Sequence, residues 1–429
     1  MNSLIVLAVF LGLFFFRMPV CMSMGIASLV YILFIAEVPI KLLPQMMGHG
    51  IENFTLLAVP FFLLAGNLMN AGGMSGRIFR FASSIVGSLK GGLAQVVVIA
   101  SIIFGGISGS ALADCAGLGV IQTKAMTEAG YSRNFSAAIT VAASTIAPII
   151  PPSIVMVIYA VAADTSIARM FIGGIIPGLI MGGTLMVMNY WYATTGRKVC
   201  PTEPFQGVSH VLKVFKGSFW AVLSPVVIIA GMVGGMVTPT EASVLAVFYC
   251  LVVGLMYREL KLKDIPKILV DTMKQTVVIM FIIGIATVIS WIITKERVPA
   301  IVADSILSLT RDKYLILLLI NVFLFIVGCI IETIPAMLLV IPVLLPIIDA
   351  VGIDRVHFGV VLCVNMMIGI ITPPMGIGLY VMTAVANVKL EEITKEAIPF
   401  IIPLTVALIM ITYIPQIVLF LPNLIMGKG

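Results

Sequence analysis

The chain has 429 residues, of which 61% are hydrophobic and only 10% are charged, with a formal net charge of +6. A water-soluble fold of this size is excluded, because too few charged side chains remain to cover its surface. Lipid is therefore the expected solvent, and the length allows roughly a dozen crossings at about 20 residues each.

Several function classes are excluded by the distribution of charged and metal-binding side chains. No run rich in Lys and Arg interleaves with aromatic residues, so nucleic-acid binding is not expected. The six cysteines and three histidines are scattered singly, which argues against a disulfide framework and a transition-metal site. The surplus of basic residues instead fits the orientation signal of a membrane protein.

Long apolar runs along the chain predict continuous membrane spans, beginning with a retained segment at the N-terminus that has no basic residues before it. The runs cover residues 4–16, 20–35, 54–69, 170–191, 219–236, 242–256, 277–294 and 399–421. Residues 73–90 and 295–313 are amphipathic and too polar to span. They are predicted to form interfacial arm helices on opposite faces of the membrane.

Four further apolar regions are interrupted. Residues 93–119 and 314–348 are broken by glycine-rich or polar turns, and each is predicted to enter the membrane and return as a hairpin. Residues 134–163 and 358–386 are broken by prolines, which remove helical hydrogen bonds. Each is therefore predicted to be a broken helix whose unwound segment is covered by protein or lines a wet cavity.

The interrupted regions occur twice at a constant spacing of 222 residues. The identical pairs are Gly106 and Gly328, Gly130 and Gly352, Arg133 and Arg355, Pro151 and Pro373, Pro152 and Pro374, Ile176 and Ile398, and Pro177 and Pro399. An odd number of predicted crossings separates the copies, so the repeats are expected to be inverted. The basic connectors at residues 197–216 and 258–267 assign their side of the membrane to the cytoplasm. The expected fold is thus an all-α polytopic membrane protein of two inverted repeats, each with a re-entrant hairpin and a broken helix.

The first hairpin tip places Ser108, Ser110 and Asp114 in apolar surroundings. A carboxylate at this depth costs at least about 2.5 kcal/mol to insert, so Asp114 needs a partner. Hydroxyl and carbonyl oxygens at a turn between two half-helices are ligands that Na⁺ prefers. The tip therefore predicts a Na⁺ site, facing the break that contains Pro148. By the repeat, the second tip with Glu332 faces its own break and holds either a second cation or part of the substrate.

At these positions the sequence resembles the large membrane subunit of tripartite ATP-independent periplasmic (TRAP) transporters. The resemblance rests on Gly105–Asp114, Gly130-Tyr131, Ala147–Ser153 and Gly234–Ala242, and it covers nearly the whole chain. It implies an elevator-type transporter, similar in fold to the divalent-anion/sodium symporters, in the bacterial inner membrane. Such a transporter imports an organic acid with a Na⁺ gradient and needs no organic cofactor. The family carries C4-dicarboxylates, sialic acid and other sugar acids, and overall likeness favours sialic acid.

The resemblance also implies site residues and partners. The first Na⁺ site falls on Ser108, Ser110, Asp114, Ala147, Pro148 and Pro152, and the second on Glu332, Thr333, Gly369 and Thr372. Substrate is expected between the tips, at Ser153, Thr333, Pro373 and Pro374. The expected partners are a separate small four-helix membrane subunit and a periplasmic substrate-binding protein. Residues 91–169 and 314–386 are the expected halves of a mobile transport domain. Residues 1–90 and 170–313 supply scaffold spans and the arm helices, and residues 387–429 an interfacial segment and the final span.

Two other classes compete with this interpretation. A Na⁺-coupled anion symporter that works without a binding protein would share the fold and differ in its partners. Gly106–Gly109 also fits the G-x-S-G pattern of rhomboid-type intramembrane serine proteases. That chemistry needs a histidine base near the serine, and His49, His210 and His357 all lie in predicted connectors. An ATP-driven pump is not expected, because the chain lacks the G-x-x-x-x-G-K-[ST] motif.

Overall fold

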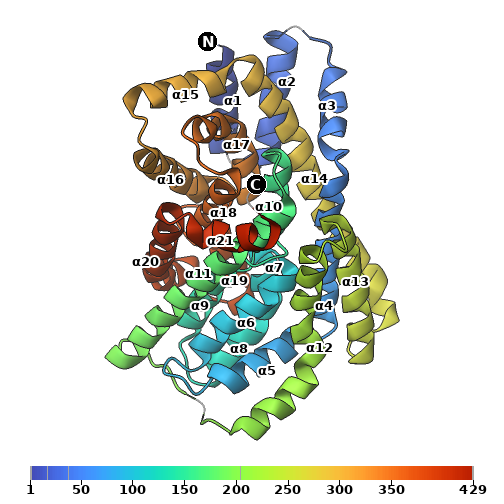
Figure 1. The fold of residues 1–429 in the computed structure, drawn as a ribbon, viewed down its shortest axis with the longest axis vertical. Helices are drawn as coiled ribbons and strands as arrows, with labels where there is room; N and C mark the ends of the chain where they lie inside the picture. Colours follow the sequence, from blue (N-terminus) through green and yellow to red (C-terminus); the bar gives the residue numbers. More distant parts are fainter. Residues whose placement is uncertain (1, 17, 37, 203, 428–429) are drawn as a thin grey trace.

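The computed structural model describes residues 2–16, 18–36, 38–202 and 204–427, and all regular secondary structure in these ranges is helical (Figure 1). Eight helical segments in this part of the chain are long and apolar enough to cross a membrane. They are Phe54–Ala71 (η1 and α4), α11 (Ile167–Thr195), α12 (Val208–Val233), α13 (Pro239–Met256), Leu262–Lys295 (η2 and α14), α16 (Lys313–Ile330), α17 (Thr333–Ala350) and α20 (Leu390–Tyr413).

All four predicted interruptions are present in the structure. The first hairpin consists of α6 (Leu93–Ser108), α7 (Ala111–Ala116) and α8 (Leu118–Glu128), and the second consists of α16 and α17. The first broken helix is formed by α9 (Arg133–Ser144) and α10 (Ile154–Ala162), and the second by α18 (Arg355–Ile370) and α19 (Ile377–Ala386). The Pro151-Pro152 and Pro373-Pro374 peptide bonds are both cis, at the same spacing of 222 residues.

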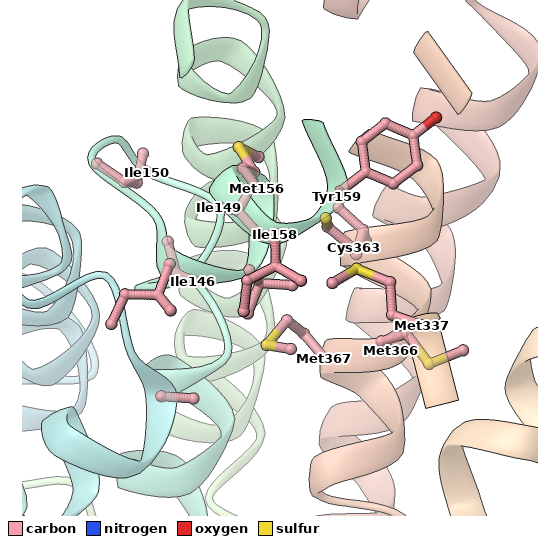
Figure 2. Close-up of a cluster of buried hydrophobic side chains, with 14 of the residues drawn as sticks. Ile146, Ile149, Ile150, Met156, Ile158, Tyr159, Met337, Cys363, Met366 and Met367 are labelled. Atoms are coloured by element: carbon pink, nitrogen blue, oxygen red, sulfur yellow. The ribbon is translucent and has the colours of Figure 1, made fainter. Parts of the chain in front are cut away.

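The two sets of hairpin and broken helix pack into each other. The first hairpin packs against α9 and the second against α18, while α10 contacts α17 and α19 contacts α7. Figure 2 shows the apolar interior of this contact, where Ile158 of α10 approaches Met337 of α17 and Met367 of α18, and Tyr159 of α10 lies beside Cys363 of α18. The Tyr159 hydroxyl also donates to the Arg355 carbonyl oxygen at 2.7 Å. These interleaved contacts hold the two hairpin tips in a fixed relation to each other.

The remaining helices surround this body. α14 packs against α2 (Val20–Phe34), α3 (Leu42–Ile51) and α4, and α13 packs along α4. α1 (Asn2–Phe15) lies against α2. Helices α4 and α14 matter most for function, because one face of each reaches the hairpin tips.

Helices are present at both predicted arms. α5 (Met74–Val86) buries Met74, Ile78 and Ala82, which recur every four residues and so form one apolar face. α15 (Val298–Leu309) lies at one end of the long axis of the molecule, and α5 lies near the other end (Figure 1). The two arm helices therefore lie far apart along the longest dimension of the molecule, and their assignment to opposite faces of the membrane stays a prediction.

Some predicted boundaries are wrong. The final span is not continuous over residues 399–421: α20 ends at Tyr413, and a separate helix, α21 (Gln416–Met426), begins after Pro415. Proline cannot continue the hydrogen-bonding pattern of α20, which accounts for the break. Helices α12 and α14 begin at Val208 and Ile265, so residues 208–216 and 265–267 of the predicted basic connectors belong to these helices. The short helix α3 was not predicted.

Candidate transport site

A cavity of about 630 Å³ lies where the two hairpin tips and the two helix breaks meet α4 and α14. Most of its wall is apolar. Six of its lining residues have polar side chains: Asn67, Asn70, Ser110, Gln275, Glu332 and Thr333. No Lys, Arg or His side chain is among the described residues that line it. The cavity is in the size range of about 300–1,000 Å³ that is typical of small-molecule sites.

The first hairpin tip turns at Gly109. Gly109 has a φ of +57°, and a Cβ atom at this position would lie 2.5 Å from the Pro152 carbonyl oxygen, so only glycine fits. The next residue, Ser110, caps α7 by accepting a hydrogen bond from the Ala113 amide at 3.4 Å. Ser110 and Pro148 both line the cavity, so the first tip and the first break meet there as predicted.

Close backbone contacts fix each tip against its break. A Cβ atom on Gly105 would lie 2.6 Å from Cα of Ala147, and one on Gly369 would lie 2.5 Å from the Gly328 carbonyl oxygen. The Met375 amide also donates to the Cys329 carbonyl oxygen at 3.1 Å, which joins the second break to the end of α16. In both halves, small residues therefore allow the broken helix to touch the hairpin directly.

Asp114 and Ser108 are buried behind the first tip and do not line the cavity. Each is only 1% exposed. Neither carboxylate oxygen of Asp114 nor Oγ of Ser108 has a hydrogen-bond partner among the described residues. Buried oxygens without donors are the groups that a small hard cation would satisfy, so these residues fit a Na⁺ ion.

The second tip presents its polar groups directly to the cavity. Glu332 precedes the first residue of α17, Thr333, and both line the cavity together with Gly369. No hydrogen bond or ion pair among the described residues involves the Glu332 carboxylate. Thr372 lies apart from the cavity, and its hydroxyl donates to the Ile368 carbonyl oxygen at 2.7 Å.

Three of the residues expected to bind substrate do not line the cavity. Ser153 is fully buried, donates its hydroxyl proton to the Pro148 carbonyl oxygen and accepts from the Met156 amide at 3.1 Å. Pro373 and Pro374 are exposed and lie outside the cavity. Of the expected substrate residues, the structure places only Thr333 in the cavity wall.

Sequence reasoning missed the polar residues on the opposite wall. Asn67 and Asn70 come from α4, and Gln275 comes from the first part of α14. The only signal in the sequence was the presence of amide side chains at the ends of predicted spans. Such residues often only hold two helices together, so the signal does not separate packing from binding.

The geometry offers no support for a serine protease. The Ser108 hydroxyl has no partner among the described residues, and His357, which is buried, contacts the Ile411 carbonyl oxygen through Nε2 at 2.9 Å. Among all the residues that the structure describes, no group of three or more His, Cys, Asp or Glu side chains lies close enough together to hold a metal ion.

Comparison with known proteins identifies the family. Residues 7–417 match the family model for the DctM component of the tripartite ATP-independent periplasmic transporter. The chain is 41% identical to the sialic acid TRAP transporter large permease protein SiaM of Vibrio cholerae over 98% of both chains. It is 36% identical to the C4-dicarboxylate TRAP transporter large permease protein DctM of the same species, over 97% of this chain and 96% of that one.

A solved structure supports the fold. The YdaH transporter of Alcanivorax borkumensis superposes with a TM-score of 0.63 over 86% of each chain, at 15% sequence identity. At that identity the likeness concerns the fold alone, which is that of a polytopic membrane transporter. The family match and the full-length relatives, which are named as transporter permeases, determine the class. The chain therefore belongs to the DctM family of TRAP transporter large permease subunits and is a transport protein, not an enzyme.

Proposed function

We propose that this subunit couples the import of an organic acid to Na⁺ entry across the bacterial inner membrane. The observation that carries the proposal is the set of three buried oxygens on Ser108 and Asp114 that lack donors, directly behind a cavity shared by both hairpin tips. The first Na⁺ ion would bind these oxygens, Ser110 and backbone carbonyls of the Ala147–Pro152 break.

A second Na⁺ ion would bind at the second tip, where Glu332, Thr333 and Gly369 line the cavity and Thr372 lies in the adjoining break. The substrate would occupy the cavity between the tips. An acid placed there meets no cationic side chain among the described lining residues, so its charge needs another counter-charge. Bound Na⁺ would supply that charge, which gives a physical reason for the acid and the ion to move together.

The names of the relatives indicate the substrate class, which is an organic acid. Full-length relatives are named for sialic acid and for C4-dicarboxylates, and the higher identity to SiaM favours sialic acid or another sugar acid. A tripartite system with a large permease also implies two further components, a small membrane subunit and a periplasmic binding protein.

The proposed movement is that of an elevator. The two hairpins and two broken helices, related as inverted repeats, would move as one body past the surrounding helices, including α4 and α14, and carry the hairpin-tip side of the cavity across the membrane. The close packing of α10 on α17 and of α19 on α7 supports this, because it joins the two halves into one unit.

Uptake into proteoliposomes that contain this chain with its small subunit tests the function. We expect acid uptake only with a Na⁺ gradient and with the binding protein present. Equal uptake after replacing Na⁺ by K⁺ would contradict the coupling. Full Na⁺-dependent uptake without the binding protein would favour the alternative, a binding-protein-independent symporter.

A further inference from the structure

Three amide side chains lie in the wall of the cavity that faces the hairpin tips. Asn67 and Asn70 extend from α4, and Gln275 extends from α14. We call these three residues the amide wall. Asn67 and Asn70 are half-buried, Gln275 is exposed, and all three line the cavity. Together they are half of its polar lining residues.

A hydrogen-bond network fixes the orientation of the first amide. The Thr272 hydroxyl donates to the Ile268 carbonyl oxygen at 2.8 Å, so its oxygen is left to accept. The Asn67 amide nitrogen donates to that oxygen at 2.8 Å and to the Gln275 carbonyl oxygen at 3.4 Å. Asn67 therefore has its Oδ1 atom free as an acceptor, and Gln275 has its Nε2 atom free as a donor, with no partner among the described residues.

A single side-chain hydrogen bond orients Asn70. The Ser75 hydroxyl donates to its Oδ1 atom at 2.7 Å, which leaves the Nδ2 group free as a donor among the described residues. The side chain rests on Gly117, where an added Cβ atom would lie 2.5 Å from both Nδ2 and Oδ1 of Asn70. Glycine at the junction of α7 and α8 thus leaves the space that Asn70 occupies.

The free atoms of the amide wall are one acceptor and two donor groups with no net charge. A hydroxyl or an N-acetyl group both donates and accepts, so it can be satisfied by this set. A second carboxylate could accept from the two donor groups, but it could not donate to the Oδ1 atom of Asn67. Its charge would also meet the Glu332 carboxylate and no described cation in the cavity wall. The wall is therefore better matched to the hydroxylated part of a monocarboxylate than to the far end of a dicarboxylate.

We infer that Asn67, Asn70 and Gln275 are specificity-determining residues that select a hydroxylated monocarboxylate, such as a sugar acid, over a C4-dicarboxylate. This assignment rests on the proposed function, because it names the substrate class of the same cavity. The carboxylate of the substrate lies toward the hairpin tips, and its hydroxyl-bearing part lies against α4 and α14.

Ligand-dependent thermal unfolding of the purified full chain in Na⁺ buffer tests the assignment. The probes are sialic acid and gluconate as hydroxylated acids, and succinate as a C4-dicarboxylate. We expect stabilisation at lower concentrations of a hydroxylated acid than of succinate. Gln275→Leu and Asn67→Leu should raise the half-saturating concentration of the hydroxylated acid about tenfold, the effect of one or two lost hydrogen bonds, and leave that of succinate unchanged.

Thr276→Val is the matched control. Thr276 is the next residue on α14, does not line the cavity, and its hydroxyl has no partner among the described residues, so its loss should leave the preference unchanged. Gln275 is exposed, so its replacement should not prevent folding even if Asn67→Leu does. An equal loss of affinity for both classes of acid in Gln275→Leu would overturn the assignment.

The wild-type measurements separate this assignment from the proposed function. Succinate that stabilises the protein in Na⁺ buffer at a lower concentration than sialic acid and gluconate do would overturn the selectivity. Na⁺-coupled acid transport would still stand. An absence of Na⁺-dependent stabilisation by all three acids would contradict the proposed function itself, and the assignment would fall with it.

Discussion

Asp114 and Ser108 have buried oxygens for which the described residues supply no hydrogen-bond partner. A carboxylate that is 1% exposed and lacks a hydrogen-bond donor is costly, so it persists only where a ligand or a function compensates for it. The sequence pointed to both residues, because a charged side chain in an apolar hairpin is conspicuous. It could not show that they lie behind the cavity and not in its wall.

Asp114→Asn removes the charge and keeps the shape of the side chain. We expect the Na⁺ concentration that gives half-maximal uptake to rise at least about tenfold, because a charged ligand contributes more than a neutral one. Uptake rates measured over a Na⁺ series in proteoliposomes check this. Asp304→Asn, at an exposed position on α15, is the control and should match the wild type. An unchanged Na⁺ dependence in Asp114→Asn would exclude Asp114 as a ligand.

Ser153 has a structural task that does not require contact with substrate. Its hydroxyl caps α10 and satisfies the Pro148 carbonyl oxygen in a fully buried setting. Ser153→Ala should therefore lower the free energy of unfolding by about 1–2 kcal/mol. Thermal unfolding checks this against Ser166→Ala, which removes the exposed cap of α11 and should cost less. Equal losses in the two variants would show that the Ser153 hydroxyl has no special role.

At the scale of elements, the contact between each hairpin and its broken helix depends on small residues. The sequence predicted where the four interruptions fall, because glycine and proline act locally on backbone hydrogen bonding. It placed the final span wrongly, although Pro415 marked the break between α20 and α21. It missed α3 because residues 42–51, with Pro44, Gly48 and Gly50, carry no strong helical pattern.

Gly369→Ala tests the contact between the second hairpin and its break. The added methyl group would lie 2.5 Å from the Gly328 carbonyl oxygen and would push α16 away from α18. Overpacking of this kind costs about 1–3 kcal/mol, so we expect initial uptake rates to fall at least about tenfold. Gly183→Ala, on α11 with no atom within 4 Å of the new methyl group, should keep the wild-type rate. Normal uptake by Gly369→Ala would mean that the close approach is dispensable.

At the scale of the whole molecule, the ends of distant helices are tied by polar contacts. Lys198, in the segment after α11, pairs with Glu396 of α20 at 2.6 Å, and both side chains are about three-quarters buried. Asn134 of α9 also donates to Glu392 of α20 at 2.9 Å. These contacts connect α20 to the first broken helix and to the segment that follows α11.

A double-mutant cycle on Lys198→Ala and Glu396→Ala measures this connection. We expect a coupling free energy of about 1 kcal/mol from thermal unfolding, because the pair is partly shielded from solvent, and we expect it to decrease as salt is added. A coupling near zero at low salt would show that the ion pair does not stabilise the fold.

The arrangement of the whole molecule was only partly predictable. The repeat of 222 residues and the family resemblance placed the two tips and breaks together, and the structure has Ser110, Pro148, Glu332, Thr333 and Gly369 in the wall of one cavity. Their roles in binding stay a prediction. The repeat and the resemblance could not place Asn67, Asn70 and Gln275, because the contact of α4 and α14 with the tips lies outside the repeat. The role of Gly117 was equally unpredictable, because nothing in the sequence around it shows that it leaves space for the Asn70 side chain.

The central claim is that acid and Na⁺ move together through this subunit, and simultaneous measurement of both fluxes tests it most directly. In proteoliposomes with the small subunit and the binding protein, addition of the transported acid should accelerate entry of radioactive Na⁺ in proportion to acid uptake. Asp114→Asn should weaken this acceleration, and Asp304→Asn should preserve it. Acid entry that leaves the Na⁺ flux unchanged would contradict the claim.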